Sequence, residues 1–324
     1  MIDEGKAYTS GTSFRARAEA QQRRFRADVL RLGHGDHAHW LMQDDAAQGK
    51  NFYGRAHAAV LARAAGAKGV GLDRTRVNML SSQAMCFNIF GNLQSADGLA
   101  VATRALRQFI PSIKHVRQIH LEYTPSNDML GDQSARGGVD CDVLVEYDTA
   151  GGGGLLAIET KFVEEEFSTC GFRKKTASAS CREGTCPGGD FSGCLYAARK
   201  GYQYWNRSRQ MGTLKAKLLR GDMPCPFGGG LWQLWVNHTL VHAEVRHRQL
   251  QEATFAVCAP KNNCALLKGG ETIEIFQNLL ADSRSMKFIA LEDLFEAFED
   301  SADQSPFWRG WIEYLQGRYV IVQE

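Results

Sequence analysis

The sequence predicts an α/β fold in which helices cover both sides of a mixed β-sheet. Three observations predict this class. Segments with helical spacing of apolar residues come before and after residues 137–162, which form a strand hairpin around a glycine loop. A second strand-like run, "ATFAVCAP" at 253–260, follows later and ends at a proline. Amphipathic helices then close the chain, at 290–300 and in "PFWRGWIEYLQGRYV".

The chain has 324 residues, of which 44% are hydrophobic, and this is enough for a full core. It shows no internal repeat and no clean linker. We expect a helical, basic N-terminal segment at 1–50, followed by one domain at 51–324 with a cysteine-rich insertion at about 168–193. The formal net charge is only +2, so a nucleic-acid partner would have to contact a local basic patch.

The N-terminal stretch "MIDEGKAYTS" lacks the apolar core of a signal peptide. No run approaches the ~18 apolar residues that a membrane helix needs. We therefore expect a cytoplasmic protein without a membrane partner. Nine cysteines, an odd number, in such a chain favour reduced thiols or a metal site over a disulfide framework.

Several elements are predicted before the hairpin. Residues 78–93, "NMLSSQAMCFNIFGNL", have Ser81 or Ser82 as a cap and apolar residues almost all round, which predicts a buried helix. Gln83 in its first turn is polar and needs a partner there. An amphipathic helix at 97–110 and an alternating strand at 115–125 lead to the hairpin.

The hairpin carries charge in its two most strand-like runs. Period-2 alternation places Asp140 and Asp142 on one face of the first strand, and Glu159 and Lys161 on the matching face of the second. The opposite face is almost wholly apolar. An antiparallel hairpin of this length brings the carboxylates of Asp142 and Glu159 close together. Asp140 shares the face of Asp142, and both aspartates stay candidates.

Two carboxylates held close together repel each other and are costly to bury, and a divalent cation removes that cost. Mg²⁺ (or Mn²⁺) prefers such oxygen ligands, together with water and phosphate. Lys161 follows Glu159 by two residues and can contact a phosphate oxygen or a water. This set of groups suits phosphodiester hydrolysis. The alternative is an ordinary amphipathic hairpin with a solvated charged face.

A cysteine-rich segment follows the hairpin. Its four thiols, Cys170, Cys181, Cys186 and Cys194, suit a tetrahedral Zn²⁺ ion or an iron–sulfur cluster, although no C-x₂-C pair is present. A loop this poor in apolar residues needs another source of order. The alternative is a set of loose surface thiols with one helical core cysteine.

Positive charge gathers in the same region, where helical spacing returns at 193–219. Residues 170–220 contain eleven Lys and Arg against two acids, with Tyr202, Tyr204 and Trp205 interleaved. Basic residues mixed with aromatic ones favour binding to a nucleic-acid backbone over a merely solvated surface.

The pattern D-x(n)-E-x-K on a hairpin resembles the PD-(D/E)xK nuclease superfamily. Further segments resemble an uncharacterised bacterial group of restriction-endonuclease-like proteins: "NMLSSQAMCFNIFGNL", "DVLVEY…LLAIETKFVEEEFS", "KGYQYWNRS" and "WIEYLQGRYV". The resemblance spans roughly residues 50–320, and only the hairpin motif is chemically specific. It implies a restriction-endonuclease-like three-layer core. It also implies a DNA endonuclease acting in restriction or phage defence, with homodimers as a common way to cut both strands.

The resemblance also implies roles for individual residues. Asp142, Glu159 and the backbone carbonyl of Thr160 would hold the metal, and Lys161 would be the catalytic lysine. The supporting residues would be Ser82, Gln83, Glu164 and Gln203, although Arg207 stands where a tyrosine often follows the glutamine. Some nucleases of the superfamily carry iron–sulfur clusters near the core. An inactive nucleic-acid-binding module and an RNA-directed nuclease remain alternatives.

Overall fold

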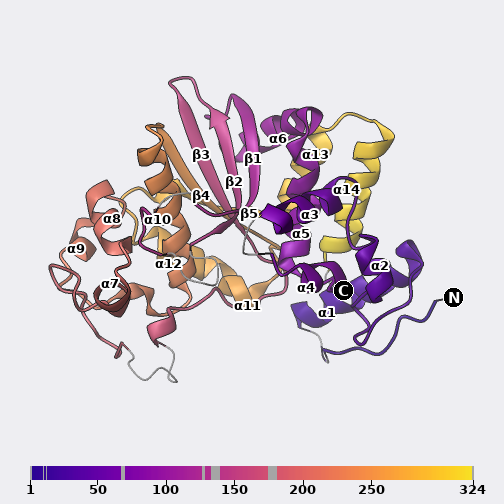
Figure 1. Ribbon diagram of the computed structural model, residues 1–324, viewed down its shortest axis with the longest axis horizontal. Helices are drawn as coiled ribbons and strands as arrows, with labels where there is room; N and C mark the ends of the chain where they lie inside the picture. The colour runs from indigo at the N-terminus through magenta and orange to yellow at the C-terminus, as the bar shows by residue number, and fades with distance from the viewer. Residues whose placement is uncertain are drawn as a thin grey trace.

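The fold is built on one five-stranded sheet (Figure 1). The computed structural model describes residues 2–9, 11, 13–66, 70–125, 128–132, 139–173 and 181–322. The strands are β1 (His115–Tyr123), β2 (Cys141–Asp148), β3 (Gly153–Thr160), β4 (Glu252–Ala259) and β5 (Met286–Ala290). They lie in the order β1-β2-β3-β4-β5. β1, β2 and β3 pair antiparallel, whereas β3, β4 and β5 pair parallel, so the predicted mixed sheet is confirmed.

β2 and β3 form the predicted hairpin. Val143 lies opposite Ile158 and Tyr147 lies opposite Gly154. The turn is closed by the amide of Thr149, which donates to the carbonyl of Gly152 at 2.8 Å. A Cβ at Gly154 would lie 2.4 Å from the ring of Tyr147, so the close approach of that ring requires glycine here.

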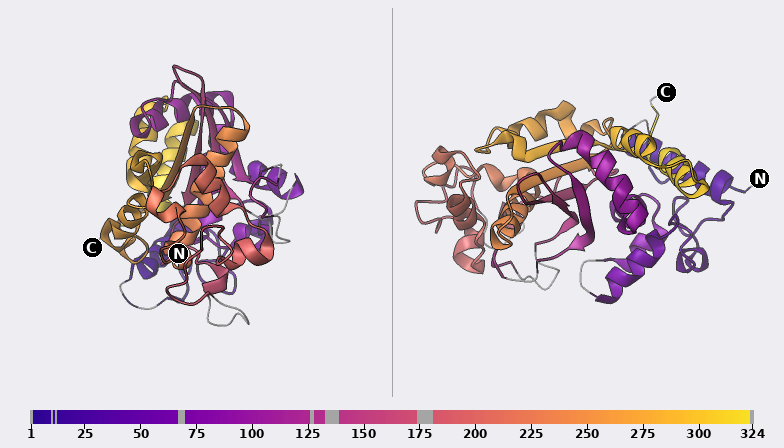
Figure 2. Two further views of the ribbon diagram at one scale, coloured as in Figure 1. Left: turned by 90° about the vertical axis from the view of Figure 1, so that its left-hand side faces the viewer. Right: turned by 90° about the horizontal axis from the view of Figure 1, so that it is seen from above.

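Helices cover both faces of the sheet, as predicted (Figures 1 and 2). One face packs on α5 (Ser82–Phe90), α6 (Ala96–Phe109), α13 (Leu291–Ser301) and α14 (Pro306–Tyr319). The other face packs on α8 (Tyr204–Met211), α10 (Leu231–His247) and α12 (Glu271–Gln277). Alternate residues of the strands enter the two cores: Val143 and Ile158 enter the first, and Leu144 and Ala157 the second. Every residue of β3 is buried, which is typical of a strand covered on both faces.

The remaining helices are shorter or peripheral. They are α1 (Phe14–Arg24), α2 (Gln43–Ala47), α3 (Ala56–Gly66), α4 (Leu72–Val77), α7 (Leu195–Lys200), α9 (Ala216–Leu219) and α11 (Cys264–Leu267). A π-helix at Phe25–Leu30 continues α1, and short 3₁₀ helices occur at Gly91–Gln94, Gly171–Arg173, Pro226–Gly228, Lys268–Gly270 and Ser283–Ser285. The single helical stretch expected at 193–219 is thus three helices, because Gly201 and Gly212 end α7 and α8 in the left-handed region.

The N-terminal segment packs against the end of the chain. The ring of Phe14 meets Phe162 at 6.4 Å between centroids, and Gln21 donates to the carbonyls of Gly317 and Val320. Arg26 is fully buried and donates to backbone carbonyls, including that of Ala38. The division into 1–50 and 51–324 stays a prediction, and residues 174–180 of the expected insertion lie outside the described residues.

Within the described ranges, no helix is both long enough and apolar enough to cross a lipid bilayer.

Candidate active site

The candidate site lies at the end of the sheet opposite the β2–β3 turn. Val143 pairs with Ile158 in the antiparallel hairpin. Asp142, one residue before Val143, therefore lies beside Glu159, one residue after Ile158 and near the end of β3. Lys161 follows β3 directly, and its amide donates to the carbonyl of Cys258 on β4 at 2.9 Å. Helix α10 covers this end of the sheet. The hairpin geometry therefore brings the predicted aspartate, glutamate and lysine to one place.

Glu159 and Lys161 form a buried ion pair. Their side chains are 5% and 10% exposed, and Nζ of Lys161 lies 2.8 Å from Oε1 of Glu159. Two amides of α10 also hold the carboxylate: Nε2 of Gln233 donates to Oε1 at 2.7 Å, and Nδ2 of Asn237 donates to Oε2 at 2.6 Å. The carboxylate of Glu159 is thus fixed on three sides.

Asp142 is half-buried and is held from the neighbouring strand. Its Oδ2 accepts hydrogen bonds from both the amide and the hydroxyl of Thr160, each at 2.7 Å. Burial raises the pKa of Asp142, and the charge of Lys161 and these two hydrogen bonds oppose the rise. Asp140 precedes Asp142 by two residues. Burial, and then the charge of Asp142, raise the pKa of Asp140 to about 6, and the charge of Arg63 opposes this rise. The geometry next to Lys161 therefore favours Asp142 over Asp140.

The site carries more negative than positive charge. Burial, and then the charge of Asp142, raise the pKa of Glu159 to about 8, although Lys161 opposes this shift. Burial alone would lower the pKa of Lys161, but the charges of Glu159, Asp142 and Glu164 outweigh it and the net shift is upward. The raised pKa values of these carboxyl groups, with one lysine beside them, indicate that a further cation would be stabilised at this site.

Glu122 on β1 is a further acid at this end of the sheet, and it is not among the residues predicted from the sequence. Its side chain is 5% exposed, its backbone has φ +50°, and Oε1 has no hydrogen-bond partner among the described residues. Burial and then Asp142 raise its pKa to about 9, while a hydrogen bond with Gln83 opposes the rise. Nothing in "HLEYT" distinguishes this glutamate from a solvated one, because its burial depends on helices distant in sequence.

The residues predicted to support the site divide into two groups. Ser82 donates to Oε1 of Glu164 at 2.6 Å, and Oε2 of Glu164 accepts from the amide of Phe162 at 2.7 Å. Gln83 interacts with Glu122 and accepts from the hydroxyl of Thr75. Ser82, Gln83 and Glu164 therefore lie around the ion pair.

Gln203 does not join them. It precedes α8, donates to the carbonyl of Gly201 at 2.6 Å and accepts from Asn206 at 3.0 Å. The glutamine that contacts Glu159 is Gln233. Gln233 and Asn237 stand four residues apart, on one face of α10, and this spacing was the available sequence signal.

The cysteines gather on the far side of α10. Three of the four cysteines predicted for a second metal site, Cys170, Cys181 and Cys194, line one cavity, and the metal site itself stays a prediction. Cys186 does not line it, because this residue is exposed and its thiol faces the carbonyls of Gly184 and Asp222. The fourth thiol of the cavity belongs to Cys225.

The donor atoms suit a hard cation. Asp142 and Glu159 offer carboxylate oxygens in a site with more acidic than basic groups, and Thr160, whose carbonyl is the third predicted ligand, directly follows Glu159 in sequence. In the part of the chain that the structure describes, no group of three or more His, Cys, Asp or Glu side chains is arranged to hold a metal ion. A cation here would thus depend on the two carboxylates with backbone, water and substrate oxygens.

Comparison with known families agrees with this geometry. The sequence matches the family described as the PD-(D/E)XK nuclease superfamily over residues 9–184 and 223–321. This range contains Asp142, Glu159 and Lys161, and it omits 185–222, the stretch that forms α7, α8 and α9. No curated protein and no solved structure gives a significant match. Since the matched residues cover most of the chain and the mixed sheet with flanking helices fits the fold, the chain belongs to the PD-(D/E)XK nuclease superfamily.

Proposed function

We propose that this chain is an active, metal-dependent nuclease that hydrolyses phosphodiester bonds of DNA at the site of Asp142, Glu159 and Lys161. The observation that carries the proposal is the buried Lys161–Glu159 pair, with a 2.8 Å contact, next to a second carboxylate. Burying an ion pair with surplus acid costs stability that an apolar cluster would not cost. A site of this kind is explained if it must bind a cation and a phosphate.

Each residue would have a separate task. Asp142, Glu159 and the Thr160 carbonyl would hold Mg²⁺ or Mn²⁺, which supplies an activated water and neutralises charge on the phosphate. Lys161 would donate to the phosphate or to the attacking water. Gln233 and Asn237 would keep Glu159 oriented. The high pKa of Glu122, about 9, lets it hold a proton near neutral pH.

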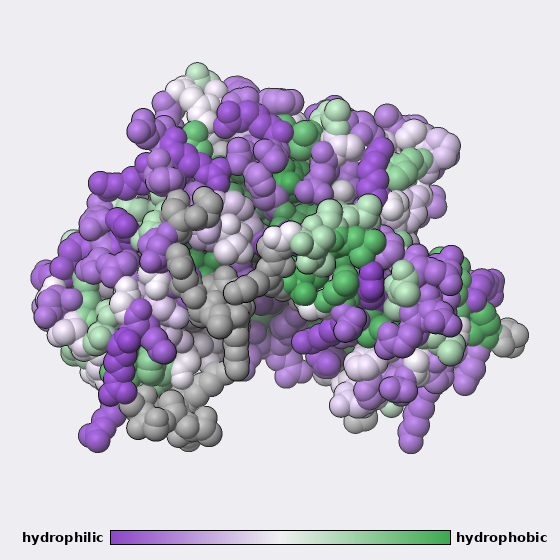
Figure 3. Space-filling model, in the orientation of Figure 1, coloured by the Kyte–Doolittle hydropathy of each residue, from purple (hydrophilic) through white to green (hydrophobic). Residues whose placement is uncertain are grey.

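The surroundings of the site support a nucleic-acid substrate. Figure 3 shows that the molecular surface is hollowed between the part that contains α7–α9 and the part that contains α1 and α2. Basic residues on the α7–α9 side are exposed: Arg182, Arg199, Lys200, Arg209, Lys215, Lys217 and Arg220. Such a surface fits phosphate-backbone binding. Tyr204 and Trp205, however, are each only 2% exposed, so they belong to the core and cannot stack on bases.

The proposal is tested by incubating plasmid DNA, linear DNA and RNA with the protein and Mg²⁺, Mn²⁺ or EDTA. Wild type is compared with Asp142→Ala and Lys161→Ala, which we expect to lose about a hundredfold or more in cleavage rate. Gln233→Ala should lose about tenfold, because it removes an orienting contact rather than a ligand. Gln203→Ala is the matched control, and its rate should stay near that of the wild type.

Undiminished cleavage by both Asp142→Ala and Lys161→Ala would remove the proposed site. DNA binding without metal-dependent cleavage by the wild type would instead indicate an inactive binding module of the same fold. Cleavage restricted to RNA would change the substrate class and leave the site intact.

A further inference from the structure

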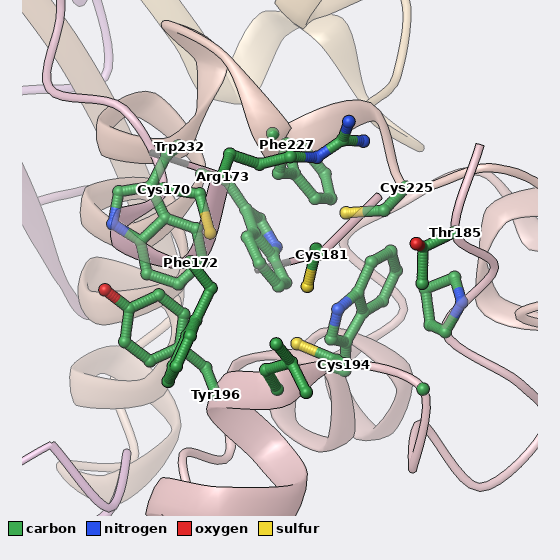
Figure 4. Close-up of a pocket in the computed structure, with 16 residues that line it drawn as sticks. Cys170, Phe172, Arg173, Cys181, Thr185, Cys194, Tyr196, Cys225, Phe227 and Trp232 are labelled. Carbon is green, nitrogen blue, oxygen red and sulfur yellow. The ribbon is translucent and has the colours of Figure 1, made fainter. Parts of the chain in front are cut away.

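Four cysteine thiols from four separate stretches of chain meet at one cavity. Cys170 precedes the turn Gly171–Arg173, Cys181 follows the undescribed residues 174–180, Cys194 precedes α7, and Cys225 precedes the turn Pro226–Gly228. Figure 4 shows their sulfur atoms around one cavity, together with aromatic side chains that include Trp232 and Phe227. The other described cysteines lie elsewhere: Cys86, Cys141 and Cys258 are core residues, and Cys186 and Cys264 are exposed. Four thiols gathered from loops suggest a ligand that draws them together.

Two of the four cysteines stand at the start of a helical turn. Cys194 precedes α7 and Cys225 precedes the turn Pro226–Gly228, and neither side chain makes a capping hydrogen bond there. Neither sulfur is therefore occupied as a helix cap.

A buried donor without a full partner points into the same cavity. Trp205 lines the cavity and is 2% exposed, yet its indole nitrogen has no hydrogen-bond partner among the described residues. Arg173 also lines the cavity and supplies positive charge beside Cys225. An indole N–H and a guanidinium are the groups expected around a centre with excess negative charge.

We propose that Cys170, Cys181, Cys194 and Cys225 bind a thiophilic metal centre through four thiolates. The shared chemistry is that of an iron–sulfur cluster or of a single Zn²⁺ ion. No three of these thiols are arranged around one ion in the described structure, so zinc would have to draw them inward. A cluster carries its own iron and sulfide between the cysteines, and we therefore expect iron rather than zinc.

The proposed centre would act on the shape of the protein and not on phosphodiester chemistry. Its cavity is walled by Trp232 and Trp235 of α10, and Phe227 stacks on Trp235 at 4.1 Å between centroids. The same helix carries Gln233 and Asn237, which hold Glu159. The centre would hold the start of α10 in place from outside the catalytic site.

The test measures metal in purified protein, so its outcome does not depend on cleavage. Protein expressed with iron supplementation and purified without oxygen is analysed for iron, acid-labile sulfide and zinc, and its visible spectrum is recorded. Wild type is compared with Cys225→Ser and Cys181→Ser. Cys186→Ser is the matched control, because this neighbouring thiol is exposed and outside the cavity. X-ray absorption on the wild type counts sulfur ligands without any substitution, in case a variant fails to fold.

We expect visible absorption with iron and sulfide, about four cysteine sulfur ligands per centre, loss of metal in Cys225→Ser and Cys181→Ser, and retention in Cys186→Ser. One zinc per chain with the same pattern of loss would support the four-thiolate site with a single ion. Protein without stoichiometric metal would overturn the proposal. Metal lost in Cys186→Ser but kept in Cys225→Ser would also overturn it.

Discussion

Replacing Lys161 by methionine should destabilise the metal-free protein strongly, because it removes the cation that neutralises a buried group of acids. Coulomb's law gives an attraction of about 6 kcal/mol for the 2.8 Å contact with Glu159 at an effective dielectric constant of about 20. Part of this is offset, because the variant no longer buries an ammonium group. Breaking one partner of a buried pair typically costs about 3–5 kcal/mol, and we expect a loss in that range.

The loss should grow with pH. The folded-state pKa of Glu159 is already raised to about 8, well above its unfolded value of 4.5. A carboxyl group of this kind contributes stability below about pH 4.5 and loses it as pH rises through 8, because the folded state binds the extra proton. Without Lys161 the pKa values of Glu159 and Asp142 rise further. The difference between variant and wild type should therefore be small near pH 5 and large near pH 8.

The measurement is urea unfolding in EDTA at these two pH values. Lys217→Met serves as the control, since Lys217 is exposed and its loss should change the free energy of unfolding by less than about 0.5 kcal/mol. Adding Ca²⁺ should restore part of the stability that Lys161→Met loses, because a cation can replace the missing charge. A variant as stable as the wild type at both pH values would refute the electrostatic reasoning.

Three further substitutions test other contacts. Asn237→Leu removes the donor that lies 2.6 Å from Oε2 of buried Glu159. This variant should lower the free energy of unfolding in urea by about 1.5–3 kcal/mol and shift the pH dependence of cleavage to higher pH. An unchanged pH dependence would contradict this role of Asn237. Glu122→Gln should raise the free energy of unfolding of the metal-free protein by about 1–3 kcal/mol near pH 8, but not near pH 4, as measured by urea unfolding. The pKa of Glu122 is about 9 in the folded protein and about 4.5 in the unfolded chain, so its burial costs stability only above about pH 4.5. Equal effects at both pH values would contradict this reasoning. Arg318→Met should cost about 3–5 kcal/mol, because this fully buried side chain donates to Gln22 and Asn51, whereas exposed Arg309→Met should change little.

The hairpin was predictable because its information is local. Alternation over a few residues fixes which side chains of a strand share a face, and a glycine loop between two such runs leaves little choice of pairing. Asp142, Glu159 and Lys161 could therefore be placed together from 21 residues of sequence, Asp142 to Phe162. What the alternation did not show is that α10 also covers the charged face, so the acids are buried and not solvated.

The missing parts of the site come from residues far away in sequence. Gln233 and Asn237 follow Glu159 by more than seventy positions, and Glu122 precedes Asp142 by twenty. Gln203 was expected because the family resemblance implies a glutamine on the helix that follows the hairpin, but the helices at 185–222, which the family match omits, come before α10 in the chain. The four predicted cysteines all came from one stretch of sequence, whereas the cavity also takes Cys225, which lies beyond 185–222.

Helix α10 lies between the cysteine cavity and the candidate active site. Trp232 and Trp235 face the cysteine cavity, whereas Gln233 and Asn237 face Glu159. At about 100° per residue, the two pairs point roughly 150° apart, which places them on opposite sides of one helix. A rigid helix cannot shift on one side alone, so a change in the cavity must move the amides that orient Glu159. The stretch 185–222, which packs on α10 through α8, thus reaches the candidate active site through that helix without contributing one of the side chains described there.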